Sequence, residues 1–189
     1  MHGWWAVSYV VLWLLVIGLA LLSLALARQV GTLHLRLGPR GALEIDHEGP
    51  PLGEAPEPLE LADLDGRPIS LGGPGRSQLV LFVSPDCPVC HDMLPSLPAA
   101  ARAGGLAPLV VADLQPGDVH HLLDRVRAPV APAPLAFERY GVPGTPFAVV
   151  IDGMGVVRAK GTVNNLEQLE GLVDSGRRRQ LEALEAVSK

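Results

Sequence analysis

The chain contains two cysteines, which stand two residues apart in the string Cys87-Pro88-Val89-Cys90. Any disulfide within the chain therefore has to join Cys87 to Cys90. A bridge over two residues closes so small a loop that it restricts the unfolded chain very little, so a stabilising role explains the pair poorly. The spacing instead predicts a redox-active disulfide that exchanges with other thiols, and we expect neither a metal nor a bound cofactor.

The residues around the pair predict a strand before it and a helix after it. Leu79 to Val83 is a continuous apolar run, as in a buried central strand, and residues 88 to about 103 favour helix. Cys87 would then stand at the helix N-terminus, where free backbone N–H groups and the helix dipole lower the pKa of its thiol. We expect Cys87 to be the attacking sulfur and Cys90, one turn further in and more buried, to resolve the mixed disulfide.

Two neighbours of the pair are expected to modulate the pKa of Cys87. Asp86 places a carboxylate beside the thiol, which disfavours a second negative charge and opposes the helix terminus. His91 follows Cys90 in the first helical turn, where we expect it to add positive field near Cys87.

The rest of the chain alternates predicted strands and helices. The order of these elements predicts a mixed sheet with helices on both faces, which is the arrangement of thioredoxin-like proteins. The further elements that we expect are two short strands at 59–64 and 69–71, a strand at 109–114, a helix at 117–126, a short helix ending near 140, strands at 147–151 and 156–159, and a closing helix from about 166.

Gly144-Thr145-Pro146 stands directly before the predicted strand that begins at Phe147. An ordinary trans proline starting a strand is the commoner case, but thioredoxin-like proteins place a cis-proline there, facing the cysteines. We therefore expect a cis Thr145–Pro146 bond. If Thr145 lies opposite Cys87, its backbone N–H and C=O can pair with an extended substrate segment.

The amino-terminal part of the sequence predicts a membrane anchor. No charged residue occurs from Trp4 to Ala27, and 24 helical residues span roughly 36 Å, enough to cross a hydrocarbon core of roughly 30 Å. Residues 28–58 contain several Gly-Pro and Pro-Pro breaks and are expected to form a linker. Residues 59–189 then form the thioredoxin-like domain.

Two observations leave the anchor and its orientation open. Ala25-Leu26-Ala27 has the small-x-small form that signal peptidase accepts, so a cleaved signal peptide is the alternative. Arg28, Arg36 and Arg40 follow the span, so the positive-inside rule alone would keep the domain in the cytoplasm, whereas the cysteine chemistry favours the periplasm.

The overall charge argues against one class of partner. The 15 basic and 20 acidic residues give a formal net charge of −5, which provides no electrostatic footprint for phosphate backbones. We therefore expect a lipid bilayer and other proteins as partners, and no nucleic acid.

Two rival chemistries use the same residues. Cys87-Pro88-Val89-Cys90-His91 is also a C-x-x-C-H string, which attaches c-type haem in electron-transfer proteins. The strand before the pair, Pro88 within it and the β-rich remainder fit a small helical cytochrome poorly. A peroxiredoxin-like site is also disfavoured, because Val80 occupies the position where its motif requires proline.

Several strings together resemble the MauD family of methylamine utilisation proteins. They are Gly38-Pro39-Arg40-Gly41-Ala42-Leu43, Leu64-Asp65-Gly66-Arg67, Ser84-Pro85-Asp86-Cys87-Pro88-Val89-Cys90 and Val156-Val157-Arg158-Ala159-Lys160-Gly161. The resemblance covers nearly the whole chain and implies one amino-terminal anchor in the bacterial inner membrane with a thioredoxin-like domain in the periplasm.

The resemblance also implies a substrate. Members of the family are implicated in maturation of the disulfide-rich small subunit of methylamine dehydrogenase, so we expect an exported cysteine-rich protein as substrate and a membrane protein as redox partner. The alternative within the same chemistry is a thiol reductant for cytochrome c maturation, like other anchored thioredoxin relatives.

Overall fold

The computed structural model describes residues 3–36, 47–115 and 126–187. The chain divides into two units, Met1–Gly38 and Pro39–Lys189. The first contains the helix α1 (Gly3–Arg36), whose segment Gly3–Ser23 has a mean hydropathy of 2.4 and is long and apolar enough to cross a membrane. An apolar amino-terminal helix is thus confirmed, and it serves either as an anchor or as a signal sequence.

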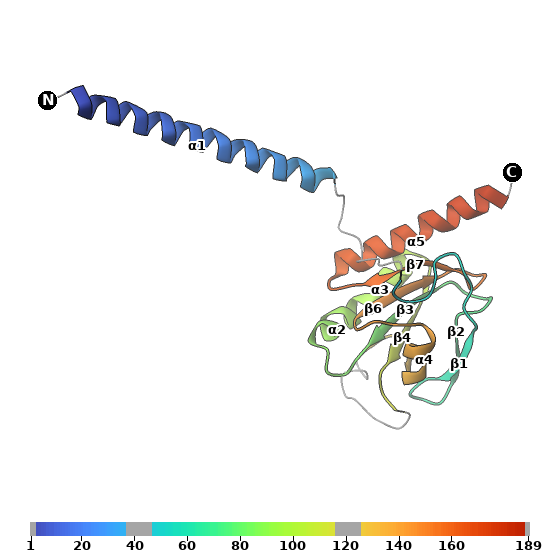
Figure 1. Cartoon of the computed structure of the whole chain (residues 1–189). Helices are drawn as coiled ribbons and strands as arrows, with labels where there is room; N and C mark the ends of the chain where they lie inside the picture. The colour runs from blue at the N-terminus through green and yellow to red at the C-terminus, as the bar shows by residue number, and fades with distance from the viewer. Residues whose placement is uncertain (1–2, 37–46, 116–125, 188–189) are drawn as a thin grey trace. The chain divides into compact units, whose positions relative to one another are not determined.

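The second unit is a mixed sheet with helices on both faces, as the sequence predicts (Figure 1). Its elements are β1 (Leu59–Ala62), β2 (Pro68–Leu71), β3 (Gln78–Val83), α2 (Pro88–Met93), η1 (Leu94–Ser96), α3 (Leu97–Ala103), β4 (Ala107–Ala112), β5 (Val130–Pro132), α4 (Pro134–Arg139), β6 (Phe147–Ile151), β7 (Val157–Thr162) and α5 (Leu166–Val187). The strand order of the sheet is β5-β4-β3-β6-β7, in which β3, β4 and β5 run parallel while β6 and β7 are antiparallel to their neighbours. A separate hairpin pairs β1 with β2.

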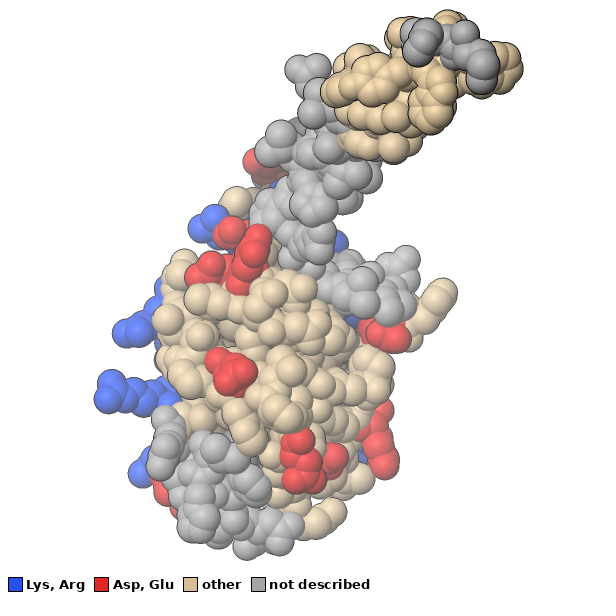
Figure 2. Space-filling model, turned by 90° about the vertical axis from the view of Figure 1, so that its left-hand side faces the viewer, with Lys and Arg blue, Asp and Glu red and all other residues tan. Residues whose placement is uncertain are grey.

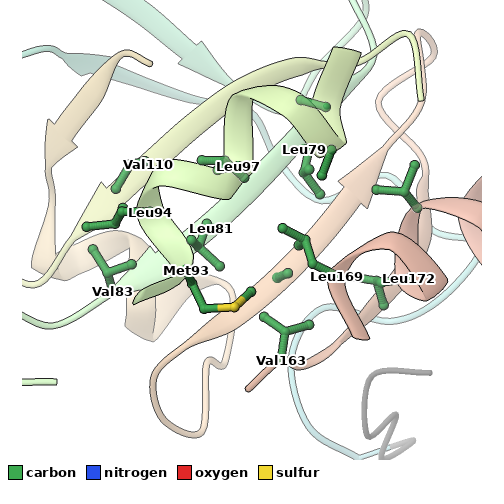
Figure 3. Packing of buried hydrophobic residues seen from close by; sticks show 14 of the residues in the cluster. Leu79, Leu81, Val83, Met93, Leu94, Leu97, Val110, Val163, Leu169 and Leu172 are labelled. Carbon is green, nitrogen blue, oxygen red and sulfur yellow. The ribbon is translucent and has the colours of Figure 1, made fainter. Parts of the chain in front are cut away.

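One face of the sheet is covered by α2, α3 and α5 (Figure 3). Alternate residues of β3 point into this layer, because successive side chains of a strand face opposite sides. Leucine and valine side chains from the strands meet those of the helices, and the layer also contains Cys90. The residues labelled in Figure 3 are Leu79, Leu81, Val83, Met93, Leu94, Leu97, Val110, Val163, Leu169 and Leu172.

The other face packs against α4 and the β1–β2 hairpin. Phe82 of β3 lies edge-on to Phe137, with 5.1 Å between ring centroids, and also contacts the ring of Tyr140. The buried Tyr140 hydroxyl donates to the Leu71 carbonyl at 3.4 Å. The central strand β3 is therefore buried on both faces, which explains its unbroken apolar sequence.

The structure differs from the sequence prediction in several elements. The helix expected over residues 88–103 is divided into α2, η1 and α3, because Pro95 and Pro98 lack the N–H that a continuous helix requires. The short strand β5 was not predicted, and α5 continues to Val187. The helix predicted over 117–126 lies almost entirely outside the described residues.

The segment predicted as a linker also differs in detail. Helix α1 continues through Arg36, and part of residues 47–58 is hydrogen-bonded to the domain. Gly49 N–H donates to the Gly141 carbonyl at 3.0 Å, and Gly53 N–H donates to Val157 at 2.9 Å. A Cβ on Gly49 would lie 2.5 Å from the Phe147 ring, so this segment packs tightly against the residue that follows Pro146.

Candidate active site

The cysteine pair lies where the central strand passes into the first helix of the domain. Strand β3 ends at Val83, a turn follows in which the Cys87 N–H donates to the Ser84 carbonyl at 3.2 Å, and Cys87 caps α2. Cys87 and Cys90 form a disulfide with 5.3 Å between their Cα atoms. The Cys90 N–H points at Cys87 Sγ over 3.2 Å, so a donor already faces the sulfur that would carry negative charge after reduction.

The two sulfurs differ in their access to solvent. Cys87 is half-buried, whereas Cys90 is completely buried in the apolar layer beneath α2. Another thiol can therefore approach Cys87 Sγ, while Cys90 Sγ is reached through Cys87. This asymmetry agrees with the predicted division of roles between attacking and resolving sulfur.

Thr145 and Pro146 lie beside the disulfide because of the sheet topology. Strand β6 is antiparallel to β3, with Phe147 opposite Phe82, so the residues before β6 meet the residues that follow β3. The Thr145–Pro146 bond is cis, as predicted. Cys87 Sγ lies 3.7 Å from the Thr145 carbonyl oxygen. In the oxidised protein Cys87 Sγ carries no proton, so the two atoms are in contact without a hydrogen bond. In the reduced protein the Cys87 thiol can donate to the Thr145 carbonyl oxygen.

The structure also places the two expected modulators of Cys87. Asp86 is exposed and directly precedes Cys87 in the turn. The half-buried His91 lies in the first turn of α2, and its Nε2 atom donates to the Pro85 carbonyl at 2.9 Å. The role of this carbonyl could not be foreseen from residue types, because it depends on where a backbone oxygen points.

The surface of the α2 side of the domain is largely uncharged (Figure 2). In this view separate acidic side chains lie among uncharged ones, and most of the visible basic side chains lie along the left margin. Pro88 and Val89 within the motif are exposed, Val89 to 36%. The exposed Pro88 and Val89 beside the disulfide, with the exposed carboxylates of Asp86 and Asp92 on either side of the pair, are suited to contact with a polypeptide.

The haem alternative conflicts with this geometry. Both sulfurs that would carry thioether bonds are joined to each other, and the His91 ring is bound to the Pro85 carbonyl.

Proteins of known structure share the fold of this domain. A protein from Bacteroides thetaiotaomicron assigned as a disulfide isomerase matches 75% of this chain and 99% of its own, with a TM-score of 0.61 and 18% identity. A protein from Chlorobium tepidum assigned as the thiol:disulfide interchange protein DsbE matches 71% of this chain and 99% of its own, with a TM-score of 0.55 and 25% identity. A secreted disulfide oxidoreductase of Mycobacterium tuberculosis matches 62% and 95%, with a TM-score of 0.50 and 23% identity. The fold is thioredoxin-like, and the chain is a thiol-disulfide oxidoreductase with a Cys-x-x-Cys redox centre.

Proteins with similar sequences identify the family within this class of thiol-disulfide oxidoreductases. The methylamine utilization protein MauD of Paracoccus denitrificans is 39% identical in an alignment of 179 positions that covers 90% of this chain and 88% of that protein. MauD of Methylorubrum extorquens is 40% identical in an alignment of 177 positions that covers 89% of this chain and 84% of that protein. No protein-family model matches the chain. At this identity and coverage the chain belongs to the MauD family.

Proposed function

We propose that this chain is a membrane-anchored thiol-disulfide oxidoreductase that acts in the bacterial periplasm on an exported, cysteine-rich protein. The observation that carries the proposal is the asymmetric disulfide, with an accessible Cys87 sulfur facing Thr145 and a buried Cys90 sulfur behind it. Such an arrangement accepts one extended segment of another protein at a time.

The exchange reaction balances without a cofactor. In the oxidising direction, a substrate thiolate attacks Cys87 Sγ and the Cys90 thiolate leaves, giving a mixed disulfide. A second substrate thiolate then attacks the substrate sulfur and releases the Cys87 thiolate, so the substrate is oxidised by two electrons and the pair is reduced. In the reducing direction Cys87 attacks the substrate disulfide and Cys90 resolves it. Either direction requires a redox partner that resets the pair, and we propose a membrane protein for this role.

Thr145 and Pro146 are the proposed substrate-binding residues. Thr145 offers its backbone beside Cys87 Sγ, where an extended segment can pair with it as an added strand would. Asp86 and His91 are the proposed modulators of the Cys87 thiol. Their positions in the turn and in the first turn of α2 support these roles.

The substrate that we propose is the disulfide-rich small subunit of methylamine dehydrogenase. Membership of a methylamine utilisation family supports this substrate. A Cys90→Ser variant of the full chain is the direct test, because loss of the resolving sulfur makes a mixed disulfide persist. Recovery of that subunit linked to Cys87, and its absence with a Cys87→Ser control, would support the proposal. If Cys87 were linked only to unrelated proteins, the proposed identity of the substrate would be refuted.

The periplasmic location is proposed from the chemistry, since a disulfide that must be kept oxidised suits an oxidising compartment. The arginines after the span favour the opposite orientation. A reporter enzyme fused after Lys189 that is active only outside the cytoplasm tests the location. An inactive reporter on a stably produced fusion would refute it.

The direction of exchange is tested by the reduction potential of the full chain in detergent micelles, equilibrated in glutathione buffers. A value near about −120 to −180 mV indicates a disulfide donor or isomerase and supports the maturation role. A value near about −270 mV or lower indicates a reductant and supports the cytochrome c alternative. The Cys90→Ser variant, which cannot form the internal disulfide, is the control.

A further inference from the structure

The turn that leads into the attacking cysteine is held by two hydrogen bonds. The Cys87 N–H donates to the Ser84 carbonyl at 3.2 Å, which closes the turn through the backbone. The His91 ring donates from Nε2 to the Pro85 carbonyl at 2.9 Å. Since His91 belongs to α2, the second bond ties the helix to the turn that precedes it.

The chemistry of this second bond defines the state of the ring. A carbonyl oxygen can only accept, so His91 Nε2 has to carry a proton. Both the charged ring and one of the two neutral tautomers carry a proton on Nε2. The bond to Pro85 therefore does not need a positive charge. A side chain with an uncharged N–H at the same reach could replace it.

The consequence concerns the position of the Cys87 sulfur. Cys87 Sγ has two fixed neighbours, the Cys90 N–H at 3.2 Å and the Thr145 carbonyl at 3.7 Å. Pro85 lies two residues before Cys87, so holding its carbonyl limits how far the turn can move. Because hydrogen bonds weaken steeply with distance and angle, a small displacement of the turn reduces the contact between Sγ and the Cys90 N–H.

We propose that His91 is a positioning residue, whose Nε2–H holds the Pro85 carbonyl and so keeps Cys87 Sγ against the Cys90 N–H and the Thr145 carbonyl. The proposal rests on the proposed function only in that Cys87 is the exchanging sulfur. This action through geometry does not require the positive charge that the sequence interpretation invokes.

The test measures the reactivity of Cys87 directly. The full chain in detergent micelles carries Cys90→Ser, so that Cys87 is its single thiol, and its alkylation by iodoacetamide is followed from pH 5 to 10. The variants are His91→Leu and His91→Phe, which lack an N–H donor, and His91→Gln, which keeps an uncharged donor. His47→Leu is the matched control, because His47 is an exposed histidine elsewhere in the same unit.

We expect His91→Leu and His91→Phe to lower the alkylation rate at pH 7 by about three- to tenfold, the range that one hydrogen bond supplies. His91→Gln should restore the rate to near that of the parent protein, and His47→Leu should leave it unchanged. An unchanged rate in both donor-free variants would overturn the proposal. An equal loss in His91→Gln would also overturn it, since the charge of the ring and not its hydrogen bond would then be responsible.

The design separates this proposal from the proposed function. Alkylation needs no protein substrate, so the comparison among His91 variants can be read even if the substrate is a different protein. A wild-type chain that exchanges with no dithiol would refute the proposed function and leave the His91 result standing. The thermal transition of each variant is measured alongside, and the two donor-free side chains differ in shape, so that a folding defect in one does not decide the outcome.

Discussion

Asp152 stabilises the end of β6 that lies away from the disulfide, and its removal should destabilise the domain without affecting the redox site. The side chain is 3% exposed. Its Oδ1 accepts the N–H groups of Met154 at 2.8 Å and Val156 at 3.0 Å, and its Oδ2 lies 2.6 Å from Nε of Arg158. One carboxylate therefore holds the β6–β7 turn and pairs with a cation that is 18% exposed.

Asp152→Ala leaves two N–H groups and the Arg158 guanidinium without this partner. Removing one partner of a buried ion pair lowers the free energy of unfolding by about 3 to 5 kcal/mol. Because Arg158 is partly exposed, we expect a loss of about 3 kcal/mol, at the lower end of this range. Asp152→Asn keeps the Oδ1 acceptor and should lose about 1 to 2 kcal/mol. The matched control is Asp174→Asn, since Asp174 pairs with Arg177 in an exposed pair that is worth about 0.5 kcal/mol or less.

The measurement is urea unfolding of the full chain in detergent, followed by circular dichroism and, in the reduced protein, by alkylation of the buried Cys90. Tryptophan fluorescence is unsuitable, because all three tryptophans (Trp4, Trp5 and Trp13) lie in α1. Alkylation of Cys87 in the folded protein should stay unchanged, since β6 separates the two ends by about 15 Å. A loss for Asp152→Ala no larger than that for Asp174→Asn would refute the reasoning.

Three further predictions concern single side chains. Asp86→Asn should lower the pKa of the Cys87 thiol by removing a neighbouring negative charge, as measured by alkylation against pH, and an unchanged titration would count against a role for Asp86. Leu97→Ala should reduce the free energy of unfolding by about 2 to 5 kcal/mol, because Leu97 is fully buried in the layer beneath α3; a loss below about 1 kcal/mol in urea unfolding would contradict this packing. Burial raises the pKa of Tyr140 from 10.0 to about 12, so the stability that it contributes is complete below pH 10 and is lost as the pH rises towards 12. Urea unfolding should therefore show a steeper loss of stability between pH 10 and 12 for the wild type than for Tyr140→Phe, and identical slopes would contradict it.

The parts of the fold that the sequence predicts are those with a strong local pattern. The apolar run of β3 and the apolar residues of β6 identify buried strands, and a cysteine pair directly after a buried strand identifies the redox centre. The cis bond before Pro146 was predicted only through the fold, since nothing local distinguishes that proline from others.

The parts that the sequence does not predict depend on contacts between distant residues. Strand β5 has three residues and lies beside Pro129, and it exists because Val130 and Ala131 pair with β4. Residues 47–58 are rich in Pro and Gly, and this composition does not distinguish a free linker from an irregular segment that packs on a domain. The bond from His91 to Pro85 likewise requires the side-chain geometry.

The short length of α2 leads to a last prediction about the origin of Cys87 reactivity. The helix has six residues and passes into a 3-10 turn that contains Pro95, so few aligned peptide dipoles contribute. The effect of a helix terminus on charge is largely confined to its first turn, where the Cys90 N–H faces Cys87 Sγ at 3.2 Å. Replacing the exposed Pro95 by alanine, which permits a longer continuous helix, should therefore leave the pH dependence of Cys87 alkylation unchanged. If Pro95→Ala and Pro98→Ala both shifted that curve to lower pH, the length of the helix would contribute to the reactivity of Cys87. The Cys90 N–H alone would then not account for it.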